Sequence, residues 1–292
     1  MKRYDSFVMG HISIDENIYQ EKAVKEIGGA VFYSSCASHA IGYKIGVLTK
    51  LFPEDRKYLE AFTIPKENIT ALDSKNTTSI RNIYLSADRE RRTCTALSIA
   101  DPFTIEDMPN NIDSQIYHFA GLISGEFDSG MIKFLYNKGK VALDVQGFLR
   151  NVGEDKEMVF KDWKKRKEYL PCIDYLKTDA AEAEIMTGTK DRKKAAEMLF
   201  GWGAKEIMIT HNKEVLIYNG KKHYTCPLKS RNLSGRTGRG DTCFSAYITE
   251  RLNKDIEDAL LFASALVSLK MEKPGPFRGT RDEVEDYIKK HY

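Results

Sequence analysis

The segment from Ser234 to Thr242 holds the residues whose types and spacing are best suited to chemistry. It reads Ser-Gly-Arg-Thr-Gly-Arg-Gly-Asp-Thr, so that three glycines fall within six residues and an aspartate follows the last one. Glycine lets successive backbone N–H groups point into one concavity, and a following helix adds free donors and a positive dipole end. Residues 229–240 carry four cations and no acid. This pattern favours a phosphate-binding turn over a purely structural one.

Asp241 is a lone carboxylate at the donor-rich end of this segment. It could cap a helix over 242–252 by accepting a free N–H, or it could accept a proton from a hydroxyl that attacks a bound phosphate. The segment is not a Walker A loop, because no Gly-Lys-Ser/Thr follows the glycines. Arg236 and Arg239 are either solvated loop cations or forks for a phosphate or acidic substrate, and the second interpretation is favoured.

Short apolar runs alternate with helix-like stretches along the chain, which predicts βαβ units and a mostly parallel sheet. Strands are expected over 6–10, 44–49, 115–120, 141–145, 175–177 and 206–210, and helices over 33–42, 180–201, 242–252 and 259–270. Residues 12–27 and 75–100 break this rhythm, and the second stretch is expected to form a hairpin around the charged residues 88–92. Together these two segments predict a small antiparallel sheet beside the main one.

Length and composition limit the classes of protein. The 292 residues are 42% hydrophobic, which fits one large α/β domain over 1–292, with the small sheet inserted as a lid. The net charge of +3 gives no case for nucleic-acid binding, and no apolar run approaches the ~20 residues of a membrane span. The five cysteines are scattered without a CxxC pair. We therefore expect a cytoplasmic protein without disulfides or a His/Cys metal site.

Residues 235–241 resemble the C-terminal signature of the PfkB, or ribokinase-like, sugar kinases, Asp-Thr-x-Gly-Ala-Gly-Asp. The Gly-x-Gly-Asp core is kept, while Gly235 and Arg236 replace Asp-Thr and Arg239 replaces Ala. The resemblance extends over nearly the whole chain in the family's order. Its other matches are Gly10–Asp15, the Gly28-Gly29 pair, Asp144–Arg150, Asp179-Ala-Ala-Glu182, Thr210 and Pro274-Gly275-Pro276. Tyr33 stands where the family often has Asn, and the glycines that usually come directly after Thr210 are absent.

This resemblance implies a three-layer α/β/α sandwich with a β lid, and ATP-dependent phosphorylation of a hydroxyl on a small sugar, polyol or sugar acid. Asp241 would be the base, and the turn formed by Gly238, Arg239 and Gly240 would be the anion hole. The acceptor site would comprise Asp15, Gly28, Gly29 and Arg150, and the nucleotide and phosphate site Asp179, Glu182, Thr210, Arg236 and Thr237. Mg²⁺ would be held through water by Glu182, with a monovalent cation as an optional addition and a homodimer formed through the lid.

Simpler interpretations of single residues and two other functions stay open. Asp15 could be a turn carboxylate, Gly28-Gly29 a tight turn, Glu182 a surface charge and Arg150 a partner of a surface acid. A nucleoside kinase on the same fold is the alternative enzyme, and a non-catalytic sugar or nucleotide sensor is the alternative of another class. The two arginines and Tyr33 favour an acidic or unusual acceptor, such as an inositol derivative or keto-sugar acid.

Overall fold

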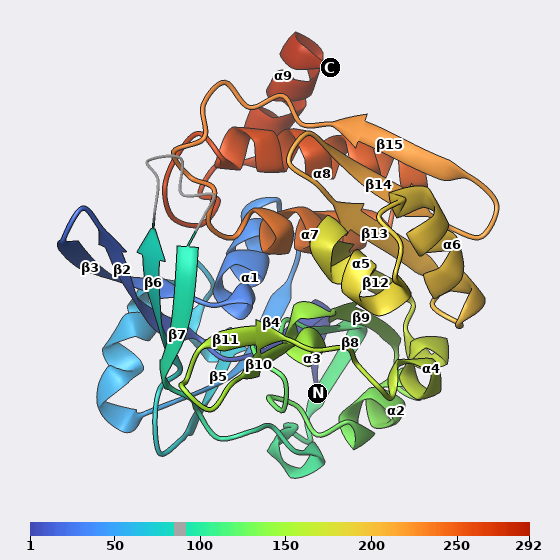
Figure 1. Ribbon diagram of the computed structural model, residues 1–292. Helices are drawn as coiled ribbons and strands as arrows, with labels where there is room; N and C mark the ends of the chain where they lie inside the picture. Colours follow the sequence, from blue (N-terminus) through green and yellow to red (C-terminus); the bar gives the residue numbers. More distant parts are fainter. Residues whose placement is uncertain (85–91) are drawn as a thin grey trace.

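A nine-stranded sheet forms the centre of the computed structural model, which describes residues 1–84 and 92–292 (Figure 1). The strands lie in the order β15-β14-β13-β12-β9-β8-β1-β4-β5. Their bounds are β1 Lys2–Met9, β4 Ile45–Leu51, β5 Ile69–Asp73, β8 Ile112–Phe119, β9 Lys140–Asp144, β12 Tyr175–Asp179, β13 Glu206–Thr210, β14 Glu214–Tyr218 and β15 His223–Pro227. All neighbouring strands from β5 to β13 pair in parallel, which confirms the predicted sheet. The antiparallel edge formed by β14 and β15 was not predicted.

Helices cover both faces of this sheet and make it the middle of three layers. The helices are α1 Ala30–Ala40, α2 Gly130–Tyr136, α3 Gln146–Leu149, α4 Arg166–Tyr169, α5 Ala180–Thr187, α6 Arg192–Gly201, α7 Arg239–Glu250, α8 Ile256–Lys270 and α9 Arg281–His291. One apolar core packs α2, α5 and α6 against the sheet, and a second one packs α7, α8 and α9. Strand β4 is buried along its whole length, as expected for a strand covered on both faces. The three-layer prediction is confirmed.

The single helix predicted over 180–201 is wrong, because the chain forms two helices there. Helix α5 ends at Gly188, which adopts a left-handed conformation with φ of 76°. Helix α6 then begins after Asp191, whose side chain accepts the N–H groups of Lys193 and Lys194. A left-handed glycine ends the first helix and an aspartate N-cap begins the second. The prediction missed this boundary because apolar residues continue on both sides of it.

A second sheet of four strands stands beside the carboxyl ends of the central strands (Figure 1). Its order is β3-β2-β6-β7, with bounds β2 Ser13–Tyr19, β3 Lys22–Gly28, β6 Ser79–Tyr84 and β7 Arg92–Ser98. The two predicted insertions therefore form one sheet. It is mixed and not purely antiparallel, because β2 and β6, the strands that join the two hairpins, pair in parallel. Of the predicted charged turn, residues 88–91 lie outside the described residues.

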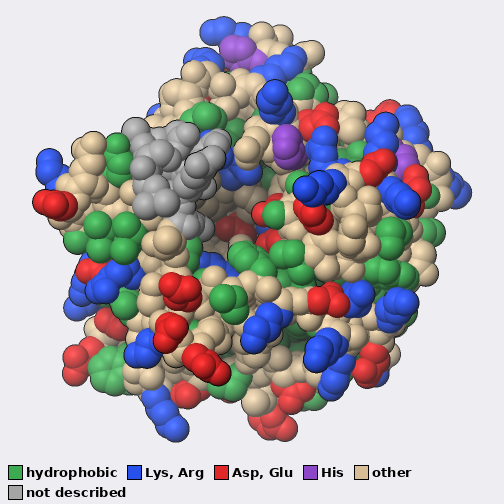
Figure 2. All heavy atoms as spheres, viewed as in Figure 1, with side chains coloured by type: hydrophobic (Ala, Val, Ile, Leu, Met, Phe, Trp, Pro, Cys, Tyr) green, Lys and Arg blue, Asp and Glu red, His purple; other side chains and the backbone are tan. Residues whose placement is uncertain are grey.

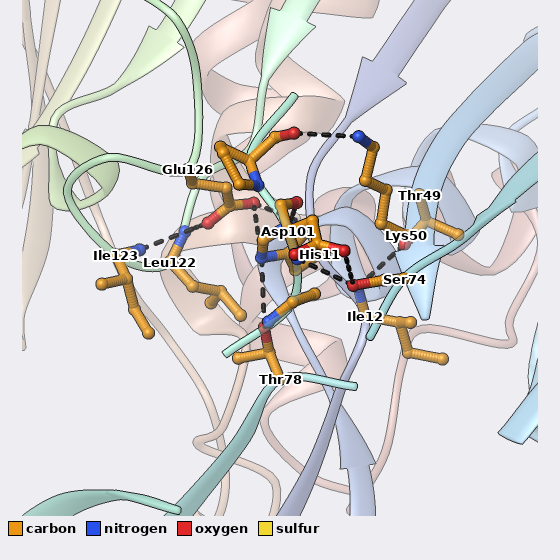
Figure 3. A network of polar contacts seen from close by, with 12 residues as sticks. His11, Ile12, Thr49, Lys50, Ser74, Thr78, Asp101, Leu122, Ile123 and Glu126 are labelled. Carbon is orange, nitrogen blue, oxygen red and sulfur yellow. Dashed lines mark hydrogen bonds and ion pairs between the residues drawn. The ribbon is translucent and has the colours of Figure 1, made fainter. Parts of the chain in front are cut away.

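The crossing between the two sheets is held by a buried polar network (Figure 3). The Glu126 carboxylate accepts the backbone N–H groups of His11 (2.6 Å), Leu122 (2.7 Å) and Ile123 (3.3 Å). The His11 ring contacts the Thr78 hydroxyl at 3.1 Å, and that hydroxyl accepts the N–H of Ala100 at 3.1 Å. This network therefore joins, at one place, the two segments of the chain that form the small sheet, the one with β2 and β3 and the one with β6 and β7.

The remaining elements connect these parts. A hairpin of β10 Arg150–Val152 and β11 Met158–Phe160 was not predicted, and it bridges to β7 through residues 95 and 157. Short 3-10 helices are η1 Pro53–Ala61, η2 Lys66–Asn68, η3 Ile105–Asp107 and η4 Leu170–Cys172. No helix in the described part of the chain is long and apolar enough to cross a membrane.

Candidate active site

The predicted anion-binding turn leads directly into α7. Gly238 is the residue before the helix and has a φ of 74°, in the left-handed region. A Cβ atom at this position would lie 2.1 Å from the Tyr33 ring, so both the backbone conformation and the packing require glycine. The helix starts at Arg239, three residues earlier than predicted. The N–H groups of its first turn therefore belong to the glycine-rich segment itself.

Asp241 lies within the first turn of α7 and not before it. Gly238 is the N-cap residue and no side chain caps the helix, so the interpretation of Asp241 as an N-cap is wrong. Ser34 on α1 donates a hydrogen bond to the Asp241 carbonyl at 3.2 Å. Burial raises the pKa of the Asp241 carboxyl to about 6, against the opposing effect of Lys177 and with a further rise from Asp144. A carboxylate tuned toward neutral pH is suited to accept a proton.

Behind Asp241 lies a buried ion pair on two adjacent strands. Lys177 on β12 and Asp144 on β9 are register partners, and the ammonium lies 2.8 Å from an Asp144 carboxylate oxygen. A Cβ atom on Gly240 would lie 3.2 Å from the same ammonium, which places this cation against the turn. Lys177 was not predicted as a site residue. The sequence could have indicated it, because a lysine inside an apolar strand needs a partner for its charge, and burying that charge unpaired would be costly.

Asp179 and Glu182 form a reciprocal cap where β12 meets α5. The Asp179 carboxylate accepts the Glu182 N–H, and the Glu182 carboxylate accepts the Asp179 N–H, both at 2.8 Å. Glu182 is only 3% exposed, so the surface-charge interpretation is wrong. Burial raises its pKa to about 8, with Lys177 opposing the rise. Thr210 ends the next strand as the register partner of Asp179, so both residues lie at one edge of the sheet.

The predicted acceptor residues Asp15, Gly28 and Gly29 lie together at the base of the small sheet. Asp15 belongs to β2 of the small sheet, so it is not a turn carboxylate. A Cβ atom on Gly28 would lie 2.8 Å from an Asp15 carboxylate oxygen. Gly29, with a φ of 103°, begins α1. Burial raises the pKa of Tyr33 on this helix, and Asp241, Glu26 and Asp15 raise it further. Tyr33 is therefore close to the acceptor residues as well as to Asp241.

The arginines and Thr237 occupy different places around this centre. Arg150 is buried at the start of β10, which excludes a pairing at the surface. Arg239 extends from the turn to the loop after β13, where its guanidinium donates to the Asn212 side chain at 3.0 Å. Its backbone N–H already donates to the Arg236 carbonyl at 3.2 Å. Thr237 is exposed, and its carbonyl accepts a hydrogen bond from Lys270, the second cation that was not predicted.

The surface is hollowed between the small sheet and the carboxyl ends of the central strands (Figure 2). Figure 2 shows this face hollowed beside the small sheet, with acidic side chains at the bottom. Ligands of open α/β sheets bind at the carboxyl ends of the strands. Asp144, Asp179 and Thr210 end their strands there, and Asp241 reaches the same place from α7.

The carboxylates fit a magnesium ion held largely through water and phosphate. The described residues contain no cluster of three His, Cys, Asp or Glu side chains that could enclose a metal. Mg²⁺ in phosphoryl-transfer sites usually needs only one or two carboxylates and takes its other ligands from water and the donor phosphates. Asp144 and Asp179 each raise the pKa of Glu182, so negative charge gathers around Glu182, and an ion held through water would offset it.

Residues 8–282 match the pfkB family of carbohydrate kinases, and the chain belongs to this family. The protein is therefore a ribokinase-like phosphotransferase that acts on an alcohol group. It is 35% identical to a solved pyrophosphate-dependent kinase of the ribokinase family, bound to a pyrophosphate analogue and myo-inositol, with 96% of this chain and 99% of that one covered and a TM-score of 0.86.

Two other relatives differ in what they bind. The chain is 27% identical to a cytidine kinase from Thermococcus kodakarensis over 254 residues, which are 84% of this chain and 87% of the other. A ribokinase from Arabidopsis thaliana, solved with ribose and ATP, has the same fold at 16% identity and a TM-score of 0.77, covering 99% of both chains.

Proposed function

We propose that the protein transfers a phosphoryl group from inorganic pyrophosphate to a hydroxyl of a small polyol of the inositol class. The observation that carries this proposal is Asp241 in the first turn of α7, beside the glycine turn and in front of Lys177. Phosphoryl transfer needs positioning and charge stabilisation more than covalent chemistry. Positioning and charge stabilisation are both supplied here, by a base, a set of free N–H groups and a buried cation that lie at one place.

In the reaction the acceptor hydroxyl gives its proton to Asp241 and its oxygen forms the new bond to phosphorus. The bond from phosphorus to the bridging oxygen breaks, and orthophosphate leaves with the bond electrons. The free N–H groups of Gly238 and Gly240 stabilise the oxygens of the group in transfer, while the Arg239 N–H is shared with the Arg236 carbonyl. Glu182 and Asp179 would hold Mg²⁺ through water, and the bound ion would neutralise part of the phosphate charge.

The acceptor lies against the small sheet, on the face that carries Asp15. Side chains two residues apart on a strand share a face, so Asn17 lies beside Asp15. Asn17 donates to Glu26 on β3 at 2.6 Å and accepts from Asn82 on β6 at 3.0 Å. A row of acceptors and donors over three strands suits a ring that carries many hydroxyl groups. The myo-inositol bound by the 35% identical kinase supports this class.

Two observations support pyrophosphate as the donor. The relative at 35% identity is a pyrophosphate-dependent kinase, whereas the ribokinase solved with ATP is only 16% identical. In addition, Arg239 reaches from the turn to Asn212 in the loop where nucleotide contacts were expected and where the glycines are missing. A cation at this position favours a short, highly charged donor. ATP with Mg²⁺ is the second candidate donor.

A donor and acceptor matrix tests the proposal. Pyrophosphate and ATP, each with Mg²⁺, are combined with myo-inositol, ribose, an inositol phosphate, a keto-sugar acid and cytidine, and the phosphorylated product is measured directly. We expect the highest kcat/KM for pyrophosphate with myo-inositol. A preference for cytidine would support a nucleoside kinase, which the relative from Thermococcus kodakarensis favours. Saturable acceptor binding without any product would instead support the sensor.

The base is tested by Asp241→Asn. We expect a fall in kcat of ~10³-fold, because a positioned general base contributes roughly 10²–10⁴-fold, while the thermal unfolding temperature stays close to that of the wild type. Asp282→Asn is the matched control, since this aspartate is exposed in the first turn of α9, away from the turn. Near wild-type turnover in Asp241→Asn would show that another group takes the proton.

A further inference from the structure

Lys270 is a buried cation directly beneath the glycine turn. It is the last residue of α8 and only 3% exposed. Its ammonium donates to the carbonyl of Gly235 at 2.5 Å and to the carbonyl of Thr237. Two backbone carbonyls from one turn therefore converge on a single positive charge. Convergent carbonyls are also how proteins coordinate monovalent metal ions.

Other contacts tie the first residues of the turn to the end of α8. The Gly235 N–H donates to the Met271 carbonyl at 2.7 Å, and the Ser234 hydroxyl donates to the Glu272 carbonyl at 2.8 Å. A Cβ atom on Gly235 would lie 1.8 Å from the Lys273 carbonyl oxygen, so the turn lies against the end of α8. These contacts fix the start of the turn. Beyond the start, the Arg239 and Thr242 N–H groups donate to the Arg236 and Gly238 carbonyls within the segment itself, whereas Lys270 ties the Thr237 carbonyl, directly before Gly238, to the end of α8.

The surroundings of the ammonium make its burial costly. Burial lowers the pKa of Lys270 to about 7, with Arg239 lowering it further and Asp241 opposing the fall. The Tyr33 ring lies 5.0 Å from the ammonium, within the range of a cation–π contact. The same ring packs against Gly238, so it covers the cation and the turn together. A charge kept in so unfavourable a place needs a role that an apolar side chain could not supply.

We propose that Lys270 is a positioning residue that supplies the cation of the glycine turn from within the chain. Its ammonium holds the carbonyls of residues 235 and 237, so that the N–H groups of 238 and 240 stay directed at the donor phosphate. The turn then needs no monovalent metal ion, which the sequence analysis had kept as an optional cofactor. This inference rests on the proposed phosphoryl transfer for its kinetic readout, but the binding of pyrophosphate tests it separately.

The first experiment measures kcat and both KM values with tetramethylammonium, K⁺ or NH₄⁺ as the only monovalent cation. We expect wild-type turnover to be the same in all three. Lys270→Met should lose roughly 10²-fold in kcat, the effect of losing one anion-hole donor, with the acceptor KM nearly unchanged. K⁺ or NH₄⁺, but not tetramethylammonium, should restore part of this loss, because the small ions fit between the two carbonyls. Lys270→Arg, which keeps the charge, should retain more activity than Lys270→Met.

Lys50→Met is the matched control. Lys50, near the end of β4, is also buried and donates to a backbone carbonyl, that of Pro102 at 2.8 Å, but its ion-pair partner is Asp107 and its hydrogen bond goes to no residue of the turn. We expect this variant to lose stability without any cation-dependent recovery. If Lys270→Met does not fold, the proposal is tested by the kinetics of Lys270→Arg and by whether the turnover of the wild type is independent of the monovalent cation. A wild-type enzyme that requires K⁺, or a Lys270→Met enzyme that turns over normally in tetramethylammonium, would overturn the proposal.

Binding separates this inference from the proposed function. Calorimetric titration with pyrophosphate, in tetramethylammonium buffer and without acceptor, should show at least 10-fold weaker binding to Lys270→Met than to wild type or Lys50→Met. Added K⁺ should restore the affinity. If the wild type binds pyrophosphate but phosphorylates no acceptor of the matrix, the proposed reaction fails and this inference stands. Equal affinities of all three proteins would refute the inference whatever the reaction.

Discussion

At the scale of single residues, the chemistry of the site depends on two carboxyl groups and two ammonium groups that lie close together. They belong to Asp144, Asp241, Lys177 and Lys270. Asp144 and Lys177 neutralise each other at 2.8 Å, while Asp241 has no direct ion pair among the described salt bridges. Burial can therefore raise the pKa of Asp241 although cations are near. A base that kept a tight ion pair would have a low pKa and a weak affinity for the substrate proton.

We predict that kcat/KM follows a bell-shaped pH profile. Asp241 must be ionised to accept a proton, so activity rises as the pH passes through about 6. Lys270 must be protonated to hold the turn, so activity falls as the pH passes through about 7 in the free enzyme. Arginine keeps its charge over this range, so Lys270→Arg should lose the alkaline fall and keep the acidic limb. The measurement is kcat/KM from about pH 5 to about pH 9.

The acidic limb tests Asp241 and the alkaline limb tests Lys270, so the two can fail independently. The charged groups that shift the pKa of Lys270 are Asp241 and Arg239. The Asp241 carboxyl titrates at about pH 6, on the acidic limb, and an arginine keeps its charge over the whole range. A profile that is flat through pH 6 would contradict the assigned base. An alkaline fall that persists unchanged in Lys270→Arg would assign this limb to another group.

At the scale of elements, the turn before α7 depends on a glycine for two separate reasons. Gly238→Ala introduces a methyl group 2.1 Å from a Tyr33 ring atom and places alanine at a φ of 74°. We expect kcat to fall by at least 10²-fold, because the N–H groups of the turn lose their direction. The double variant Tyr33→Ala/Gly238→Ala removes the overlap and keeps the backbone strain. Partial recovery in the double variant would assign the difference to packing, and normal turnover in Gly238→Ala would contradict both reasons.

The crossing between the sheets gives a second prediction at this scale. In Glu126→Gln an amide NH₂ replaces one of the two oxygens that accept three backbone N–H groups. We expect the free energy of unfolding to fall by about 2 kcal/mol, since a buried N–H loses a charged acceptor. Urea denaturation measures this loss. Glu285→Gln on the exposed side of α9 is the control and should change stability by less than about 0.5 kcal/mol. An unchanged midpoint for Glu126→Gln would show that the network does not hold the crossing.

The sequence was sufficient for elements with one clear periodicity and insufficient where an element depends on its partners. The apolar run Glu206–Thr210 predicted β13 with its observed bounds. Strand β15, by contrast, has one buried residue and no apolar run, and only its pairing with β14 makes it a strand. Lys177 and Lys270 were missed for a related reason. Their partners, Asp144 and two backbone carbonyls, lie far away along the chain.

At the scale of the whole molecule, the site exists only where three separately encoded parts meet. The strand ends supply Asp144 and Asp179, α7 supplies Asp241, and the small sheet supplies Asp15. The net charge of +3 says little about this site, because Lys177 and Lys270 are both buried in it and both close to acids. Local arrangement of charge, and not its sum, decides which ligand such a chain can bind.

The small sheet also gives the last prediction, a homodimer formed through its outer side. Ile83 and Leu97 are 38% and 39% exposed, and edge strand β3 leaves its backbone groups unpaired on one side within the described residues. Exposed apolar side chains beside an open edge favour pairing with a second copy. Light scattering at two concentrations should show dimers in the wild type and monomers in Ile83→Asp/Leu97→Asp. Tyr136→Asp, at a similarly exposed position on α2 (37%), should remain dimeric. Wild-type protein that is monomeric at both concentrations would rule out this dimer, and dissociation of the Tyr136→Asp control as well would show that added charge alone, at any surface, separates the subunits.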